Sequence, residues 1–366
     1  MFMRTRTVRF ELLLSVIFLT ACGTLRHTPP RQPLSTDRPV LTTDVVPVHV
    51  VETPPQQASV PSAPAVPAGL YNYNKVKPAQ AGTWQQGLQQ RLDQLCNTDL
   101  FETTRLALCV YDLTADSMLY SVNIDQRMRP ASNMKLVTAI TALDILPTDH
   151  RYVPHVDQPG WGWCWDDEET GITDFGAKGA RKSATQLYTE NREWTLLEVL
   201  TPMMKKSDNL LAESMFWQLP DASVTKPTRK HCAARVEALI SRLGLDPAQY
   251  TIADGSGVSL YNYLSARLLT MLLRHAYQTP RIYQSLYPSL PIAGVDGTLS
   301  GRMKGTTAQG NIHAKTGTVT GVSSLSGYCQ HPSGHQLCFS IINQGIPKAA
   351  VGRSFQDQVC QVLTSE

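Results

Sequence analysis

Ser132 and Lys135 stand three positions apart at the start of an apolar stretch, directly after Pro130 and Ala131. On a helix, positions i and i+3 lie on one face, so the lysine amine can reach the serine hydroxyl. A serine needs a base to become a nucleophile, and a lysine serves as that base only where burial or neighbouring cations lower its pKa. The N–H groups at a helix N-terminus can bind an oxyanion. The pattern therefore predicts a serine nucleophile with a lysine base.

The S-x-x-K spacing is a weak signal by itself, because ordinary composition yields on the order of one or two matches in a chain of this length. A second match spans Ser223 and Lys226. Pro227 follows it at once and disfavours a continuous helix through the pair. We therefore discard the second match.

Two further motifs follow the first in the chain: Ser207-Asp208-Asn209, between two helical patterns, and Lys315-Thr316-Gly317, on a strand-like run. The set S-x-x-K, S-D-N and K-T-G, in this order, is typical of penicillin-binding proteins and class A β-lactamases. Neither H-E-x-x-H nor G-x-S-x-G occurs. Zinc-peptidase and α/β-hydrolase interpretations therefore lack their motifs.

The sequence around these motifs closely resembles the D-alanyl-D-alanine carboxypeptidases of peptidase family S13, the low-molecular-mass class C penicillin-binding proteins. The resemblance covers most of residues 85–363 and rests on the segments PASNMKLVTA, MMKKSDNLLAE, ADGSGVSLYN, AGVDGTLSGR and HAKTGTVTGVSSLSGY. It implies an α+β protein with the penicillin-binding protein/β-lactamase-like serine transferase fold. In that fold an antiparallel sheet is flanked by helices, and the active site lies between the sheet and a helical subdomain.

The resemblance also implies roles for the first two motifs. Ser132 would be the acylated nucleophile and Lys135 its base. Ser207 would take part in the proton relay, and Asn209 would hold a peptide amide of the substrate. We assign Asp208 to structure, with its side chain fixing the loop.

The third motif would bind the substrate's end. The resemblance implies that Lys315 and Thr316 bind a terminal carboxylate and that Gly317 lets the substrate lie close to the strand. The backbone N–H groups of Ser132 and Thr318 would form the oxyanion hole. This chemistry uses no metal and no cofactor.

The implied reaction is cleavage of the terminal D-Ala-D-Ala bond of peptidoglycan stem peptides by a serine-type carboxypeptidase, with endopeptidase activity as a further option. Attack on the peptide carbonyl gives an acyl-enzyme and releases D-alanine, and water then hydrolyses the ester. β-Lactams mimic the dipeptide and act as covalent inhibitors. The alternatives are a serine β-lactamase and a non-hydrolysing β-lactam sensor or cell-wall-binding protein.

The chain departs from the family between the first two motifs. Ser132 and Ser207 are only 75 positions apart (207 − 132), so most of the family's large insert is missing. Residues 159–169, PGWGWCWDDEE, resemble a remnant of that insert. We favour a solvated acidic loop here over a site for a substrate amine, because acidic clusters are usually exposed. Which side chain the substrate carries before D-Ala-D-Ala stays open.

The N-terminus has the pattern of an exported lipoprotein. Arginines precede a ten-residue apolar run from Leu12 to Ala21, which is the length of a signal-peptide core and too short to span a bilayer. Leu19-Thr20-Ala21-Cys22 resembles the bacterial lipobox, with lipid attached to Cys22. We therefore predict a signal peptide over 1–21 and a location in the bacterial cell envelope, anchored to the membrane and facing the periplasm or exterior.

A proline-rich segment follows the lipobox. Residues 29–67 hold 10 of the 24 prolines, and no aromatic residue lies between Phe18 and Tyr71. Such a segment cannot bury enough apolar surface to offset its ordering entropy. We predict a disordered tether over 22–68 and a DD-peptidase domain over 69–366. The 366 residues carry 33 Lys and Arg against 30 Asp and Glu, a net charge of +3 that argues against a nucleic-acid binder.

Hydrophobic periodicity places the motifs on elements. It predicts helices over 84–96, 132–146, 195–206, 209–218, 229–243, 263–278 and near 355–363, and strands over 105–112, 118–122, 312–318, 322–330 and 336–343. This order predicts an α+β domain whose first and last segments share one sheet. The α/β part covers about 84–146 and 290–366, and the mainly helical part about 190–289. Asp254-Gly255-Ser256-Gly257 and Asp296-Gly297-Thr298 indicate tight turns.

Seven cysteines remain if Cys22 carries lipid, so at most three disulfides form. Cys329 and Cys338 flank a turn and are candidates for a hairpin bridge. With His331 and His335 they also form a set of potential zinc ligands, but the spacing matches no structural zinc site, so we favour a hairpin with or without a bridge. The implied fold packs the terminal helices side by side, which suggests a bridge between Cys96 and Cys360.

Overall fold

The computed structural model describes residues 83–147, 149–152, 194–224 and 227–366. The predicted signal peptide, Cys22, the tether and the acidic segment 159–169 lie outside these residues. No helix in the described ranges is long and apolar enough to span a bilayer.

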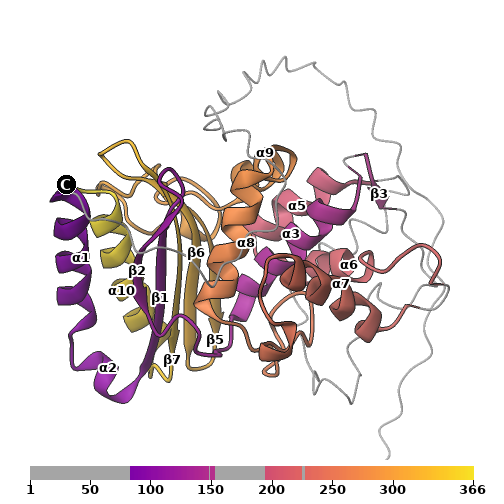
Figure 1. Ribbon diagram of the computed structural model, residues 1–366, viewed down its shortest axis with the longest axis horizontal. Coiled ribbons are helices and arrows are strands. Elements are labelled where there is room, and N and C mark those ends of the chain that lie inside the picture. The colour runs from indigo at the N-terminus through magenta and orange to yellow at the C-terminus, as the bar shows by residue number, and fades with distance from the viewer. Residues whose placement is uncertain (1–82, 148, 153–193, 225–226) are drawn as a thin grey trace, which may run out of the picture. The chain divides into compact units, whose positions relative to one another are not determined.

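A five-stranded antiparallel sheet forms the centre of the α/β part, with strand order β2-β1-β7-β6-β5 (Figure 1). Its strands are β1 (Arg105–Asp112), β2 (Ser117–Val122), β5 (His313–Val319), β6 (Val322–Gln330) and β7 (Gln336–Gln344). β1 pairs with β7 along its whole length, from Arg105 opposite Gln344 to Asp112 opposite Leu337. The first and last strand segments therefore share one sheet, as the sequence predicts.

Side chains alternate between the two faces of this sheet, and each face has its own apolar core. On one face, side chains such as Leu108 and Phe339 pack with the first and last helices, α1 (Thr83–Cys96) and α10 (Ala349–Leu363). Figure 1 shows these two helices together on that side of the sheet, with the short α2 (Leu100–Thr103) below them. Both β6 and β7 are buried along nearly their whole length. β7 is accordingly rich in apolar residues, whereas β6 also buries the small polar side chains of Ser323, Ser324 and Ser326.

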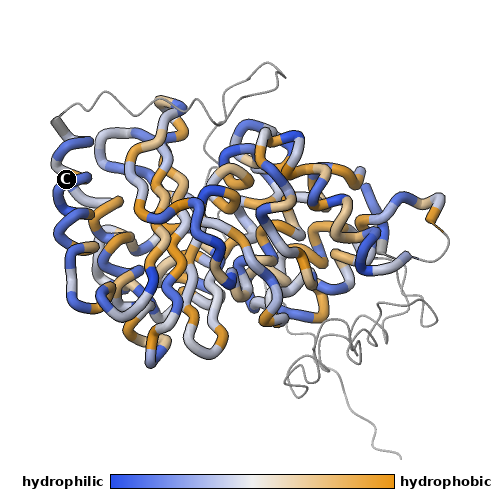
Figure 2. The backbone as a smooth tube through the Cα atoms, turned by 60° about the horizontal axis from the view of Figure 1, so that its bottom comes forward, coloured by the Kyte–Doolittle hydropathy of each residue, from blue (hydrophilic) through white to orange (hydrophobic). Residues whose placement is uncertain are grey.

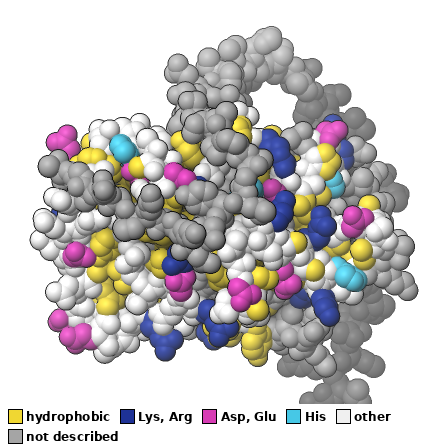
Figure 3. Space-filling model, in the orientation of Figure 1, with side chains coloured by type: hydrophobic (Ala, Val, Ile, Leu, Met, Phe, Trp, Pro, Cys, Tyr) yellow, Lys and Arg dark blue, Asp and Glu magenta, His cyan; other side chains and the backbone are white. Residues whose placement is uncertain are grey.

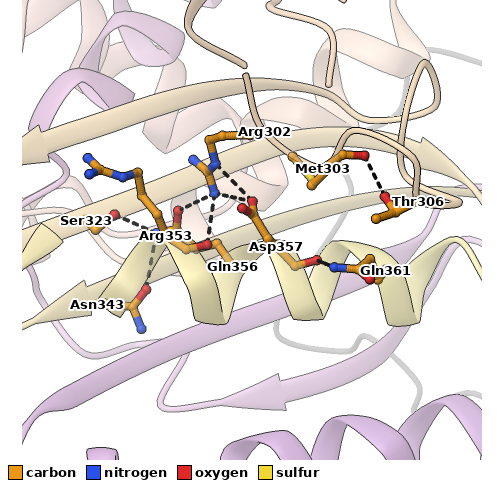
Figure 4. A network of polar contacts seen from close by, with 9 residues as sticks. All are labelled: Arg302, Met303, Thr306, Ser323, Asn343, Arg353, Gln356, Asp357 and Gln361. Carbon is orange, nitrogen blue, oxygen red and sulfur yellow. Dashed lines mark hydrogen bonds and ion pairs between the residues drawn. The ribbon is translucent and has the colours of Figure 1, made fainter. Parts of the chain in front are cut away.

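Polar contacts tie α10 to the strands and to the loop before β5 (Figure 4). Arg302 donates to the Asp357 carboxylate at 2.6 and 2.9 Å and to the Gln356 amide oxygen at 3.2 Å. Gln356 in turn donates to Ser323 at 3.0 Å and to Asn343 at 3.2 Å. The buried amide of Gln356 thereby fixes the helix against β6 and β7.

The opposite face of the sheet packs against α8 (Ala266–Gln278), and the helical subdomain lies beyond it (Figure 1). The other helices of this part are α3 (Met134–Ile145), α5 (Leu196–Lys205), α6 (Asn209–Trp217), α7 (Arg229–Arg242) and α9 (Pro280–Ser289). Hydrophobic segments run through the sheet and the central helices, while polar segments lie mostly at the outside (Figure 2). α3 is buried over ten of its twelve residues, so it is the core helix of the subdomain.

Helix α9 is an element that the periodicity did not predict. Pro280 stands at its first turn, where a missing N–H costs nothing, and Pro288 lies near its end. Both prolines look like helix breakers in the sequence. Buried Ile282, Tyr283 and Leu286 hold the helix in place through packing.

A short ribbon closes the segment between the first two motifs. β3 (Arg151–Tyr152) pairs antiparallel with β4 (Trp194–Thr195), so Tyr152 and Trp194 lie side by side. The 40-odd residues between these strands include the predicted remnant of the insert, which lies outside the described residues.

Cys329 and Cys338, the candidates for a hairpin bridge, are both free, so the hairpin forms without a bridge. Cys329 is paired in register with Leu337, and Cys338 with Tyr328. Their side chains therefore point to opposite faces of the sheet and lie in different cores. The same geometry excludes a zinc site that uses both cysteines.

The bridge suggested between Cys96 and Cys360 does not form either, although α1 and α10 do pack side by side. Cys96 lies beside Tyr120 and Asp93, at the edge of the sheet. Cys360 is fully buried next to Cys329 under the sheet. The two thiols thus have different neighbours, and both are free.

Charged side chains of both signs are interspersed over the face that Figure 3 shows. This mixture agrees with the balanced composition of the chain, 33 basic against 30 acidic residues.

Candidate active site

Ser132 lies in a single 3₁₀ turn, Ala131–Asn133, that leads directly into α3. Ala131 has a φ of +49°, a left-handed conformation that costs free energy for any residue with a Cβ. The surrounding contacts hold this turn in place. The Ser324 hydroxyl donates to the Pro130 carbonyl at 2.7 Å, and the Asn133 amide donates to Ser326 at 2.9 Å. Two side chains of β6 therefore hold the residues on either side of Ser132 in place.

Gly257 supports the same turn from the other side. Its φ is +85°, and a Cβ added there would lie 1.8 Å from the Ala131 carbonyl oxygen. Only glycine permits both the conformation and the approach. The Asp254–Gly257 loop is thus the direct neighbour of the serine turn, which extends the tight-turn interpretation of this motif.

Lys135 is fully buried one turn into α3, and its Nζ lies within hydrogen-bond distance of three oxygens. These are Oδ1 of Asn209 and the carbonyl oxygen of Ser256, both at 2.7 Å, and Oγ of Ser132 at 3.2 Å. An amide oxygen and a backbone carbonyl can only accept. A neutral amine would use its two N–H bonds for them, and its lone pair would then face the Ser132 hydroxyl. The geometry is that of a base poised on a nucleophile.

Burial lowers the pKa of Lys135 from its usual 10.5 to about 8. Nearby carboxylates of Asp254, Glu213 and Asp208 act in the opposite direction and keep it from falling further. A pKa near 8 leaves a useful fraction of neutral amine at physiological pH.

The second motif joins α5 to α6 beside Lys135. Ser207 has a φ of +58°, another left-handed residue, and Asp208 accepts from the N–H of Leu211 at 3.0 Å as the N-cap of α6. The structural role expected for Asp208 is thus confirmed. Asn209 begins the helix and reaches Lys135, so the first two motifs meet through that lysine.

The third motif lies on β5, the edge strand beside the serine turn. A Cβ on Gly317 would lie 3.0 Å from the Ser132 nitrogen and 2.2 Å from Oγ of Ser324. This glycine therefore lets the strand approach the nucleophile. Thr316 shares a hydrogen bond of 2.7 Å with Thr298, and Thr318 is exposed one residue past the glycine.

Lys315 is the second fully buried lysine of the site. In the described part of the chain, its Nζ has one hydrogen-bond acceptor, the carbonyl oxygen of Thr316 at 2.8 Å. Burial, and then the charge of Lys135, lower the pKa of Lys315 well below its usual value. A cation with one neutral partner in a dry setting is suited to receive an anion.

The structure adds Glu213, which no motif included, and gives contacts at the site to Ser256 and Thr298, which the sequence placed only in tight turns. Glu213 stands four residues after Asn209, so helical spacing places the two on one face of α6. That spacing is the signal from which it could have been found. The role of the Ser256 carbonyl had no such signal, because a backbone atom leaves no trace in residue type.

The described ranges contain no cluster of three or more His, Cys, Asp or Glu side chains arranged to hold a metal ion. The polar groups at Ser132 can support acyl transfer by general base and electrostatic means.

Comparison with protein families identifies the chain. The model of the D-Ala-D-Ala carboxypeptidase 3 (S13) family matches residues 88–162 and 168–366. The chain belongs to family S13. The match contains all three motifs and confirms the resemblance drawn from them.

Two curated relatives agree with this assignment. The S13 chain is 38% identical to a D-alanyl-D-alanine carboxypeptidase from an Actinomadura species over 188 residues, which are 49% of this chain and 35% of the relative. It is 31% identical to D-alanyl-D-alanine carboxypeptidase DacB of Haemophilus influenzae over 158 residues, 42% of this chain and 33% of the relative. The chain thus matches about a third of the length of these relatives.

Solved structures show the fold. Penicillin-binding protein 4 (dacB) from Haemophilus influenzae superposes with a TM-score of 0.55 at 16% identity, covering 76% of this chain and 97% of that one. The TLA-3 extended-spectrum β-lactamase gives 0.53 at 15% identity, with coverages of 76% and 97%. The S13 chain has the penicillin-binding protein/β-lactamase-like fold, as predicted.

Proposed function

We propose that the protein is a serine DD-peptidase of the bacterial cell envelope that cleaves the terminal D-Ala-D-Ala bond of peptidoglycan stem peptides. The observation that carries this proposal is Lys135 Nζ, held at 2.7 Å from two acceptors and 3.2 Å from the Ser132 hydroxyl. Lys315, on β5, supplies a cation for a substrate that ends in a carboxylate. Family membership supports the same reaction.

In the first half of the reaction, Lys135 takes the proton of Ser132 while Oγ attacks the carbonyl carbon between the two D-alanines. The backbone N–H groups of Ser132 and Thr318 stabilise the oxyanion. Lys315 and Thr316 bind the terminal carboxylate, and Asn209 holds a peptide amide. The proton passes through Ser207 to the leaving nitrogen, and D-alanine departs.

In the second half, water attacks the ester on Ser132, which releases the shortened peptide and restores the hydroxyl. A β-lactam enters by the same attack: its amide opens, and the acyl group stays on Ser132. The protein would thus be labelled and inhibited by β-lactams. A penicillin-binding protein of this fold has been solved in complex with a β-lactam.

The test is covalent labelling with a fluorescent penicillin beside hydrolysis of a D-Ala-D-Ala peptide. We expect stable labelling and release of D-alanine by the wild-type protein, and neither by Ser132→Ala. Rapid turnover of the penicillin would instead identify a β-lactamase. Stable labelling without peptide hydrolysis would identify a sensor, and no labelling at all would refute the proposal.

We further propose that Cys22 carries a lipid that anchors the enzyme to a membrane of the envelope. The support is the sequence alone, an apolar run of ten residues that ends in Leu-Thr-Ala-Cys. Cys22→Ser should move the protein from the membrane fraction to the soluble fraction. An unchanged membrane fraction would contradict the anchor and leave the catalytic proposal untouched.

A further inference from the structure

Glu213 is a buried carboxylate that none of the three motifs includes. It lies on α6 with 1% of its surface exposed, one helical turn after Asn209. Its Oε1 accepts from the N–H of Gly255 at 3.1 Å and from the N–H of Ser256 at 2.8 Å. Burying a carboxylate costs free energy unless hydrogen bonds or an opposite charge compensate for it. The position of Glu213 and its two contacts therefore require an explanation.

The Gly255–Ser256 peptide that Glu213 holds is one link from the base. The carbonyl of Ser256 accepts from Lys135 Nζ at 2.7 Å, and the carbonyl of Gly255 accepts from Thr138 at 2.7 Å. Asn209, on the same face of α6 as Glu213, supplies the other 2.7 Å contact to Lys135. One helix therefore sets both acceptors that direct the lone pair of Lys135 toward Ser132.

The loop has a second carboxylate, which makes it rigid. Asp254 accepts from the N–H groups of Gly257 at 2.7 Å and Ser259 at 2.6 Å, and from the Asn262 amide at 2.7 Å. These contacts shape the loop itself. Glu213 alone of the two ties the loop to the helix that carries Asn209.

The charges around Glu213 come from several elements. Burial, and then the charge of Asp254 on the loop, raise the pKa of Glu213 to about 7, while the contacts with Ser256 and Gly255 and the charge of Arg229 on α7 act to lower it. Lys135 faces it from α3, and the charges of Asp254, Glu213 and Asp208 together raise the pKa of Lys135 against the effect of burial. On β5, Lys315 interacts with Lys135 in turn.

We propose that Glu213 is a positioning residue of the active site, which fixes the Ser256 carbonyl for Lys135 and stabilises the charged form of that lysine. This inference rests on the proposed function for its kinetic consequence, but the effect on Lys135 is measurable without substrate. Glu213 touches neither the nucleophile nor the reacting bond, and acts through Ser256 and Lys135.

The experiment follows the Cε resonance of Lys135 by NMR as a function of pH, in protein labelled with [6-¹³C]lysine. Loss of the peak in Lys135→Arg assigns it. Glu213→Gln keeps an oxygen acceptor for the two N–H groups but removes the charge, so we expect the midpoint of the Lys135 titration to fall by about half a pH unit or more. Glu237→Gln, which neutralises an exposed glutamate on α7, should leave the midpoint unchanged.

A second variant separates the effect of the charge of Glu213 from the effect of its side-chain length. Glu213→Asp keeps the charge but is one methylene too short to hold the Gly255–Ser256 peptide. We expect an unshifted Lys135 titration and a maximal rate of labelling by fluorescent penicillin that is roughly tenfold lower. In Glu213→Gln the acidic limb of the labelling rate should instead move to lower pH, in parallel with the NMR midpoint.

An unshifted Lys135 midpoint in folded Glu213→Gln would overturn the proposal, and so would a wild-type maximal rate in Glu213→Asp. Thermal unfolding of each variant shows whether it is folded, and if one variant fails to fold, the other decides. If the wild-type protein takes no label while the NMR midpoint still shifts, the proposed function fails and the electrostatic role of Glu213 stands.

Discussion

The two buried lysines of the site differ in their surroundings. Lys135, on the wall formed by Asn209 and the Ser256 loop, has three oxygens around its Nζ and three carboxylates nearby. Lys315, on the wall formed by β5, has one backbone acceptor in the described residues, and burial and another lysine both act against its charge. Both are fully buried, so the contrast lies in their partners and not in their exposure.

This contrast matches two chemical tasks. A base must be held in one orientation, and its pKa must lie near the working pH, which requires fixed acceptors and compensating charge. A cation that binds a carboxylate gains most when its partners are few, because the ligand then supplies the missing charge. We therefore expect the two lysines to have different roles, and each can be substituted separately.

The largest effect is expected from loss of the base. Lys135→Ala removes the group that takes the Ser132 proton, and we expect the rate of penicillin labelling to fall by about 10³ or more. Lys230→Ala, at an exposed position on α7, should label at the wild-type rate. A Lys135→Ala protein that retains a tenth of the wild-type rate would show that another group is the base.

A large effect on stability is expected from Gly257→Ala. The substitution meets both a φ of +85° and the Ala131 carbonyl oxygen, so we expect a loss of about 2–4 kcal/mol in the free energy of unfolding. Gly305→Ala is the matched control, because its φ is +71° and nothing lies within 4 Å of an added Cβ. Urea denaturation of both variants measures the difference, and equal losses would mean that the contact with the serine turn is relaxed cheaply.

Lys315→Ala should weaken binding of the substrate carboxylate and leave the surroundings of Lys135 unchanged. Losing a charge-assisted contact with the substrate carboxylate costs about 2–3 kcal/mol, which is a fall of roughly 30- to 150-fold in kcat/KM. A substrate whose terminal carboxylate is replaced by an amide should lose little between the wild type and the variant. The exposed Lys304→Ala serves as control. If both substrates lose equally, Lys315 acts on the chemical step and not on the carboxylate.

The smallest effect per step is expected in the pH dependence of the wild type, about tenfold for each pH unit. Lys135 acts as base only when neutral, and its pKa is about 8. Below that pH, kcat/KM should therefore fall about tenfold for each unit of decrease. The lowered pKa of Lys315 works in the opposite direction, since its charge is lost as pH rises, so KM for carboxylate substrates should increase on the alkaline side. A profile that is flat between pH 6 and 8 would contradict the role of Lys135.

Much of the fold was predictable because strand and helix periods are local. The predicted strand 322–330 matches β6 residue for residue, and 105–112 matches β1. Helix α9 was missed because Pro280 and Pro288 oppose a helix locally, whereas the buried side chains of Ile282 and Leu286 stabilise it through distant contacts. Cys329 and Cys338 form no bridge because strand register places their side chains on opposite faces of the sheet.

In the candidate site, too, features that depend on local sequence were predictable and features that depend on distant contacts were not. Residue types and their order singled out Ser132, Lys135 and Lys315, and the family resemblance supplied the roles that we propose for them. The contribution of the Ser256 carbonyl and of Glu213 was not predictable, because it depends on a backbone atom and a helix face brought beside Lys135 from 121 and 78 positions away (256 − 135 and 213 − 135). The chain's sequence by itself determined which groups are available, the order of its elements and its family. Only the tertiary structure decided how the two lysines differ, because burial and partner geometry, which set a pKa and an orientation, arise when distant segments pack together.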